Sequence, residues 1–345
     1  MKNLLIKGDN LAALKMLRDE LQLRNKIDLV YIDPPFATGG SFSIDSSGRT
    51  ATISKAGEGT IAYTDTLKGA EFINFLKQRI EVIYDLLSEQ GSLYLHIDYK
   101  IGHYVKVMLD DIFGNDMFRN DITRIKCNPK NFSRVGYGNI KDMILFYTKT
   151  RTPIWHEPRI PMKQEEIERL YPKIDKYGRR YTTVPIHAPG ETQKGESALP
   201  FKGIYPPQGR HWRCSVEELE RLDKAGLIEW SATGNPRKIN YADEHATKKM
   251  QDIWDFKDPA YPTYPTEKNK EMLKTIIEAS SDESSIVLDC FAGSGGTLVT
   301  AAQMGRRWIG VDVSDAAIRI IQKNFDIAGG IFPDEKEYDF IDITR

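Results

Sequence analysis

The sequence predicts an α/β fold interrupted by an insertion, and three observations support this prediction. Over residues 1–150, short apolar runs alternate with segments whose leucines and isoleucines recur at helical spacing. Over residues 151–256, prolines are frequent and this alternation is lost. The alternation returns over residues 257–345. Because strands that alternate with helices are typical of parallel sheets, we expect 1–150 and 257–345 to form one discontinuous domain, with 151–256 inserted into it.

The composition is that of a globular protein with a sizeable core. Of the 345 residues, 40% are hydrophobic and 28% are charged. The net charge is −1, so any contact with nucleic acid must use a local basic surface. No apolar run is long enough to span a bilayer, and we expect a cytoplasmic protein without a membrane partner. The three cysteines and six histidines lack the spacing of a disulfide framework or a zinc site, so no metal is expected.

The elements expected in the first part of the chain follow from its periodicity. An apolar strand at Leu4–Lys7 precedes a helix with leucines at positions 11, 14, 17 and 21, and Ile27–Ile32 has the continuous apolar pattern of a strand buried on both faces. Residues 37–62 are rich in Gly, Ser and Thr, and a long loop is expected there. The sequence then predicts a helix over 69–89, a strand at Leu93–Ile97, a helix over 101–113, and strands over 121–126 and 142–148.

Fewer elements are predicted in the insertion than in the segment that follows it. Ser215–Glu218 has the pattern of a capping box and predicts one helix, and Trp212 is expected in a core. After Pro265 a helix is expected, followed by a strand at Ile286–Leu288, a glycine-rich turn, a second helix, and a strand at Arg307–Val311.

The glycine-rich turn is the first motif with chemical meaning. Asp289-Cys290-Phe291-Ala292-Gly293-Ser294-Gly295 joins a predicted strand to a predicted helix, whose N-terminus offers free N–H groups to a ligand. Asp312 lies 23 positions after Asp289, where nucleotide-binding βαβ units carry an acid for a ribose. The full dinucleotide signature is not present, and the helix N-terminus can equally receive the carboxylate of an amino-acid ligand. The alternative is a turn that serves packing alone.

The second motif is Asp33-Pro34-Pro35-Phe36, which follows the buried strand Ile27–Ile32. Ligands bind at the carboxyl ends of strands in open α/β sheets. The two prolines fix the backbone, so a carboxylate and a rigid carbonyl can converge on one –NH₂ group. Phe36 adds a flat face for a ring. The alternative is a Pro-Pro turn in which the aspartate only caps a helix.

Together the two motifs resemble those of the S-adenosylmethionine-dependent DNA amino-methyltransferases. Asp33-Pro34-Pro35-Phe36 looks like their D-P-P-[YF] catalytic motif, and Asp289–Gly295 resembles their D-x-F-x-G-x-G cofactor loop. The catalytic motif comes first, as in the β class, although Cys290 replaces a common Pro and Gly296-Thr297 a common Thr-Thr. The resemblance implies a circularly permuted Rossmann-like fold with a mostly parallel seven-stranded sheet and an antiparallel hairpin. It also implies that 151–256 is a target-recognition domain and that the two motif-bearing strands are neighbours.

The resemblance implies transfer of a methyl group from S-adenosylmethionine, which becomes S-adenosylhomocysteine, to the exocyclic amino group of a flipped base in double-stranded DNA. Asp33 and the Pro34 carbonyl would accept the amino hydrogens, Phe36 would stack on the base, and the loop over 37–62 would close over it. The implied catalytic residues are Asp33, Pro34, Pro35 and Phe36. The implied cofactor-binding residues are Asp9, Asp289, Phe291, Ala292, Gly293, Ser294, Gly295, Asp312, Thr266 and Lys268.

The target base and the DNA contacts are less sharply indicated. Cytosine amino-methyltransferases usually carry Ser where Asp33 stands, so adenine N(6) is expected and cytosine N(4) is the alternative. Basic residues cluster in the insertion, and the candidates for DNA binding are Arg179, Arg180, Arg210, Arg213, Arg237 and Lys238. The resemblance leaves open whether the chain forms a homodimer, as β-class members often do, and whether a cognate restriction enzyme accompanies it. More remote readings are an NAD-dependent oxidoreductase, a non-catalytic DNA-binding subunit, and a methyltransferase for RNA or protein glutamine.

Overall fold

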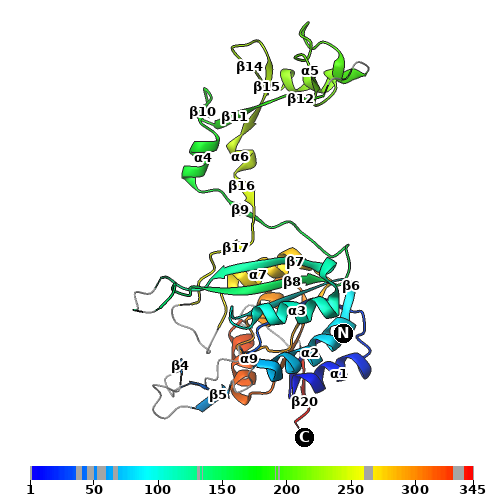
Figure 1. Ribbon diagram of the computed structural model, residues 1–345, viewed down its shortest axis with the longest axis vertical. Helices are drawn as coiled ribbons and strands as arrows, with labels where there is room; N and C mark the ends of the chain where they lie inside the picture. Colours follow the sequence, from blue (N-terminus) through cyan, green and yellow to red (C-terminus); the bar gives the residue numbers. More distant parts are fainter. Residues whose placement is uncertain are drawn as a thin grey trace. The chain divides into compact units, whose positions relative to one another are not determined.

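The structure is a computed structural model in which the chain divides into two compact units (Figure 1). Unit 1 comprises Met1–Pro158 and Gln251–Arg345, and unit 2 comprises Arg159–Met250. The residues that the structure describes are 2–35, 69–129, 133, 135–190, 192, 195–259, 267–328 and 338–344, together with the backbone of 41–44, 50–52 and 60–64. Phe36 and Thr266, two of the predicted site residues, lie outside these ranges.

Unit 1 is built on a nine-stranded sheet. In spatial order its strands are β17 (Ile253–Trp254), β7 (Phe118–Ile125), β8 (Lys141–Thr148), β6 (Leu87–Ile97), β2 (Ile27–Ile32), β18 (Ile286–Asp289), β19 (Arg307–Asp312), β1 (Asn3–Lys7) and β20 (Tyr338–Asp342). β8 runs antiparallel to both of its neighbours and the other pairs are parallel. The mostly parallel sheet with an antiparallel hairpin is therefore confirmed.

The predicted number of seven strands is wrong, because β17 and β20 extend the two edges of the sheet. β17 has two residues, which is too short for a periodic signal. β20 interleaves aspartates with apolar residues, a pattern that suits an edge strand better than a buried one. A second correction concerns 37–62, which was expected to be a loop. Its described parts include β3 (Ser41–Ile44), β4 (Thr50–Thr52) and β5 (Thr60–Thr64), which form a small antiparallel sheet.

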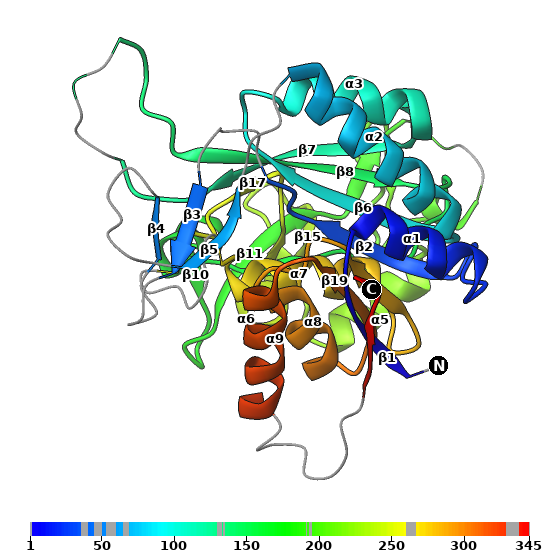
Figure 2. The same cartoon turned by 90° about the horizontal axis from the view of Figure 1, so that it is seen from below.

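Helices cover both faces of the large sheet (Figure 2). One layer contains α1 (Asn10–Asp19), α2 (Gly69–Leu86) and α3 (Gly102–Phe113), and the other contains α7 (Lys270–Ser280), α8 (Gly296–Gln303) and α9 (Asp315–Ala328). The side chains of β6 alternate between the layers. Leu93 and Leu95 lie in the core beneath the first layer, whereas the Tyr94 hydroxyl lies 2.9 Å from Ser280 Oγ of α7. Burial on both faces explains the continuous apolar sequence of these strands. Among the described residues, no helix combines the length and apolarity needed to cross a membrane.

Unit 2 is smaller and mainly antiparallel. Its elements are β9 (Arg159–Pro161), α4 (Gln164–Leu170), β10 (Lys173–Ile174), β11 (Arg180–Pro185), β12 (His187–Pro189), β13 (Arg210–Trp212), α5 (Val216–Lys224), β14 (Ile228–Trp230), β15 (Pro236–Tyr241), α6 (Ala242–His245) and β16 (Thr247–Lys249). Ser215 caps α5 by accepting a hydrogen bond from Glu218 N, as its sequence predicts. Trp212 is 1% exposed among Ile186, Phe201 and Leu219, so its expected place in a core is confirmed.

Candidate functional site

Four aspartates stand at the carboxyl ends of four neighbouring strands in unit 1. Asp33 follows β2, Asp289 ends β18, Asp312 ends β19, and Asp9 follows β1 by two residues. β18 pairs in parallel with both β2 and β19, and β19 pairs in parallel with β1. The expected adjacency of the strands that carry the two motifs is therefore confirmed, and all four carboxylates belong to one edge of the sheet.

The two oxygens of the Asp33 carboxylate have different surroundings. Oδ2 forms an ion pair and hydrogen bond with Lys268 Nζ, 235 positions away in sequence. Oδ1 is shielded from solvent and has no hydrogen-bond partner among the described residues. Because a buried carboxylate oxygen without a donor is costly, this oxygen is a ready acceptor for an N–H group of a ligand.

The glycine-rich turn is tied to Asp312. Gly293 N donates to Asp312 Oδ2 at 2.9 Å, and Ser314 N donates to Asp312 Oδ1 at 2.8 Å. Gly293 and Gly295 have φ values of +51° and +77°, which are unfavourable for any residue with a Cβ. A Cβ on Gly295 would lie 2.8 Å from Ile321 Cγ1. The turn ends where α8 begins, so the first N–H groups of this helix are available to a ligand.

Asp289 lies beneath this turn and is 3% exposed. It accepts hydrogen bonds from Phe291 N at 3.0 Å and from the Thr297 side chain. Burial raises the pKa of Asp289 to about 7, and the charges of Asp33 and Asp312 add to this rise. Burial also raises the pKa of Asp312, although the hydrogen bonds from Ser314 and Gly293 oppose the change. The site therefore holds carboxyl groups whose protonation differs from that of free aspartate.

Asp9, which follows β1, contacts helices α1 and α2. It caps α1 by accepting a hydrogen bond from Ala12 N at 2.9 Å, and it also accepts one from Arg79 Nη2 at 3.1 Å. The side chain of Asp9 is 60% exposed, whereas that of Arg79 is 6% exposed. Asn10 donates from Nδ2 to the Cys290 carbonyl at 3.0 Å and so links α1 to the glycine-rich turn. Sequence reasoning assigned no role to Arg79, because Asp9 lies 70 positions away in sequence.

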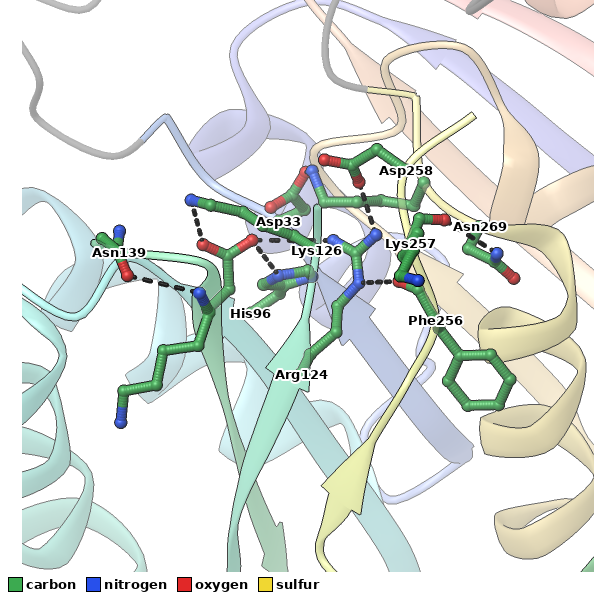
Figure 3. Close-up of polar contacts among 12 residues, drawn as sticks. Asp33, His96, Arg124, Lys126, Asn139, Phe256, Lys257, Asp258 and Asn269 are labelled. Carbon is green, nitrogen blue, oxygen red and sulfur yellow. Dashed lines mark hydrogen bonds and ion pairs between the residues drawn. The ribbon is translucent and has the colours of Figure 1, made fainter. Parts of the chain in front are cut away.

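A buried polar network lies beside Asp33 (Figure 3). Tyr31 of β2 and Asp142 of β8 both contact the ring of His96, with 3.0 Å between Tyr31 Oη and Nδ1 and 3.2 Å between Asp142 Oδ2 and Nε2. Lys126 Nζ donates to Asp142 Oδ1 at 2.6 Å. Burial lowers the pKa of His96, while His96 and Lys126 keep the pKa of Asp142 below its usual range against the effect of burial. His96 interrupts the otherwise apolar run Leu93–Ile97, and that interruption is the signal by which sequence reasoning could have found it.

Arg124 joins this network to the segment that follows β17. Its fully buried side chain donates from Nε to the Phe256 carbonyl at 2.7 Å and forms an ion pair with Asp258. Its Nη1 lies 3.6 Å from Asp142 Oδ2. Asp258 N donates in turn to the Lys126 carbonyl at 2.8 Å. Residues 256–258 are therefore fixed to β7 by both backbone and side-chain contacts (Figure 3).

Two of the predicted DNA-binding residues of unit 2 are paired with acids. Arg179 donates from Nε to Asp243 Oδ2 at 2.9 Å and from Nη2 to Glu244 Oε1 at 3.2 Å. Arg180 Nη2 lies 3.4 Å from Glu168 Oε1. These contacts offset the charges of both arginines within the unit.

The other predicted basic residues gather around His187. Arg210 Nη1 lies 3.3 Å from His187 Nδ1, Arg213 Nε donates to the His187 carbonyl at 3.3 Å, and Arg237 Nε donates to Thr183 Oγ1 at 2.9 Å. These partners are neutral, and Lys238 is exposed nearby in the chain. Burial, followed by the charges of the three arginines, lowers the pKa of His187. The positive charge of this cluster is thus less compensated than that of Arg179 and Arg180.

Comparison with known proteins gives matches over almost the whole chain. A family model described as DNA methylase, of the N(6) and N(4) methyltransferase type, matches residues 27–323. The type II methyltransferase M.EcaI of Enterobacter cloacae is 38% identical over 333 residues, which cover 95% of this chain and 70% of that protein. The DNA adenine methyltransferase YhdJ of Escherichia coli is 36% identical over 329 residues, which cover 94% of this chain and 83% of that protein.

More distant matches agree with these. The probable type III restriction–modification enzyme HindVI Mod subunit of Haemophilus influenzae is 24% identical, and the match covers 91% of this chain and 49% of that subunit. The chain thus spans about half the length of this relative. Among solved structures, the putative DNA modification methylase TTHA0409 of Thermus thermophilus, complexed with S-adenosyl-L-methionine, matches with a TM-score of 0.50 and 16% identity over 99% of each chain. This likeness shows a shared fold.

Proposed function

The chain belongs to the N(6)/N(4) family of DNA methylases, and we propose that it moves a methyl group from S-adenosylmethionine to N(6) of adenine in double-stranded DNA. Two observations favour adenine. The relative YhdJ, 36% identical, is named a DNA adenine methyltransferase, and Asp33 stands where cytosine-specific members usually carry Ser. Cytosine N(4) is the second candidate, because its amino group offers the same two hydrogens.

The observation that carries this proposal is the free acceptor on Asp33 beside the glycine-rich turn. An exocyclic amino group is a poor nucleophile because its lone pair is delocalised into the ring. Asp33 Oδ1, which has no partner among the described residues, accepts one amino hydrogen, and the Pro34 carbonyl accepts the other. These hydrogen bonds favour a more tetrahedral nitrogen, and the carboxylate stabilises the positive charge that develops on it.

The residues at the strand ends suit the cofactor. S-adenosylmethionine supplies an electrophilic methyl group on a sulfonium when it is bound. The left-handed glycines 293 and 295 allow close approach to the backbone, and the start of α8 offers free N–H groups. We assign the ribose hydroxyls to Asp312, the adenosine end to Asp9, and the methionine end to Asp289 with Phe291–Gly295. The role of Thr266 and Lys268 toward the cofactor carboxylate stays a prediction.

Unit 2 is our candidate for recognition of the DNA target. The cluster of Arg210, Arg213 and Arg237 around His187, with Lys238, is held by hydrogen bonds from its arginines to neutral partners, although Glu229 and Glu218 interact electrostatically with Arg237 and Lys238. It is therefore a better candidate for phosphate and base contacts than Arg179 and Arg180. The target base must leave the duplex to reach Asp33, and Phe36 and the segment over 37–62 keep their predicted roles in receiving it.

The names of the relatives support a role in restriction and modification. M.EcaI is a type II methyltransferase and the HindVI protein is a probable type III Mod subunit. We propose a modification role for this chain, together with the predicted homodimer and cognate restriction enzyme. Sequencing of DNA from cells that express the chain, with direct detection of modified bases, would return both the target base and the recognition site.

The decisive variant is Asp33→Ala. We expect it to reduce incorporation of labelled methyl groups into DNA by about 100-fold or more, with little change in the calorimetric affinity for S-adenosylmethionine. Asp121→Ala is the matched control, because Asp121 is exposed on β7. Full activity of Asp33→Ala would refute the catalytic assignment. Analysis of the hydrolysed product DNA separates N(6)-methyladenine from N(4)-methylcytosine and so decides between the two candidate bases.

A further inference from the structure

The ion pair between Asp33 and Lys268 gives the two oxygens of the Asp33 carboxylate different roles. Oδ2 is held by Lys268, whereas Oδ1 is shielded from solvent and has no partner among the described residues. The side chain of Asp33 is 16% exposed and that of Lys268 is 10% exposed, so water screens their interaction weakly. An ionised carboxylate only accepts hydrogen bonds. One of its oxygens is thus anchored and the other is open to a donor.

Lys268 is itself held in place by its neighbour in sequence. Asn269 caps α7 by accepting a hydrogen bond from Met272 N at 3.1 Å, and it donates from Nδ2 to the Lys257 carbonyl at 2.9 Å. Lys257 follows Phe256, whose carbonyl accepts from the buried Arg124 (Figure 3). The backbone that carries Lys268 is therefore braced on two sides, by α7 and by the 256–258 segment.

The electrostatics of the strand ends explain why a cation is needed here. Asp33 faces Tyr31 of its own strand, His96 of β6, Asp289 of β18, and Lys268 from the segment before α7. Burial favours the neutral form of His96. The charge of Asp33 disfavours ionisation of Asp289, which lies at the end of the adjacent strand. The ammonium of Lys268 compensates this repulsion at Asp33.

We propose that Lys268 is a positioning residue for methyl transfer, which fixes the Asp33 carboxylate through Oδ2 so that Oδ1 receives the amino group of the target base. The inference rests on the proposed function. A carboxylate that is free to rotate would lose the alignment between its oxygen, the Pro34 carbonyl and the amino nitrogen. Lys268 therefore acts on the rate of the chemical step rather than on the affinity for the cofactor.

The test compares Lys268→Met with Lys268→Arg in single-turnover methylation assays and in calorimetric titrations with S-adenosylmethionine. Lys268→Met is expected to lower the rate constant about 10- to 100-fold. Its affinity for S-adenosylmethionine is expected to stay at the wild-type value. Lys268→Arg keeps the charge and restores part of the rate. Lys270→Met, at the exposed first residue of α7, is the matched control and leaves the rate constant and the affinity unchanged.

Asn269→Asp provides a second variant should Lys268→Met fail to fold. It keeps the capping oxygen but loses the donor to the Lys257 carbonyl, so the rate constant is expected to fall about threefold with unchanged cofactor affinity. A Lys268→Met enzyme with the wild-type rate constant would overturn the inference. A Lys268→Met enzyme with a weaker affinity for S-adenosylmethionine and an unchanged rate constant at saturating cofactor would also overturn it, since Lys268 would then serve the cofactor carboxylate. If wild-type enzyme transferred no methyl group, the proposed function itself would fail.

Discussion

Protonation of Asp289 provides a quantitative test of the cofactor site. Burial raises the pKa of this carboxyl to about 7 from an ordinary value of 3.8. Between these two pH values the folded protein keeps a proton that the unfolded chain releases, so the stability contributed by this proton is lost as pH rises through the interval. The difference corresponds to roughly 4 kcal/mol as an upper bound. We expect Asp289→Asn to remove this part of the pH dependence.

On the proposed assignment, the cationic cofactor binds beside Asp289, favours the ionised form of this carboxyl and therefore releases the proton. With a pKa of about 7, about one thirtieth of the sites are ionised at pH 5.5 and about half at pH 7. The affinity for S-adenosylmethionine should thus rise about 15-fold over this range. The α-amino group of the cofactor stays largely protonated below about 7.7, so it contributes little in this window.

Isothermal titration calorimetry at pH 5.5, 6.0, 6.5 and 7.0 measures this dependence directly. For the wild-type protein we expect the Kd to fall with rising pH and a proton to be released that is visible as a buffer-dependent heat. Asp289→Asn should bind with a Kd that changes little over the same range. A wild-type Kd that does not change with pH, or a variant that keeps the wild-type slope, would refute the assignment of Asp289 to the cofactor site.

Two further predictions concern the basic cluster and the glycine-rich turn. The double variant Arg210→Gln/Arg213→Gln should weaken DNA binding in fluorescence anisotropy and reduce the slope of log K against log salt concentration by about 2. The control Arg179→Gln should keep the wild-type slope, because Asp243 already pairs with this arginine. Equal slopes for the wild type and both variants would contradict the proposal that the cluster contacts phosphates. Gly295→Ala should lower the free energy of unfolding by about 1–2 kcal/mol because of its left-handed backbone, and by a further amount because the new Cβ contacts Ile321. Gly305→Ala, with φ +74° and open space around its Cβ, should lose only the backbone contribution. Equal melting temperatures for the two variants would contradict the close approach of Ile321 to Gly295.

The central strands could be predicted from sequence because their burial leaves a strong signal. Ile27–Ile32 and Ile286–Asp289 are almost continuously apolar, and the structure places them side by side in the sheet. The edge strands gave no such signal, since β17 has two residues and β20 mixes aspartates with apolar residues. The strands within 37–62 were missed because Gly, Ser and Thr are typical of loops, although Thr also suits strands.

The candidate site could be predicted to the level of its motifs but not of its contacts. Family membership, inferred from the D-P-P-F motif and the glycine-rich turn, is confirmed by the match over 27–323. The pairing of Asp33 with Lys268 spans 235 positions, and that of Arg124 with Asp258 spans 134. Neither pairing leaves a local pattern, because only the folded sheet brings these segments together. Lys268 was assigned to the cofactor from its motif alone, and its partner in the structure suggests a different role.

The position of unit 2 in the chain bears on the contacts of Arg124 with Asp258 and of Lys268 with Asp33. The chain leaves unit 1 after β8 and returns at β17, the outermost strand beside β7, so unit 2 interrupts no pairing between central strands. The returning segment is then fixed by Arg124 at residues 256 and 258, and Lys268 follows ten residues later. Whatever unit 2 binds, the backbone that carries Lys268 starts from this fixed point rather than from unit 2. On the proposed function, Lys268 therefore keeps the Asp33 carboxylate aligned independently of what unit 2 binds.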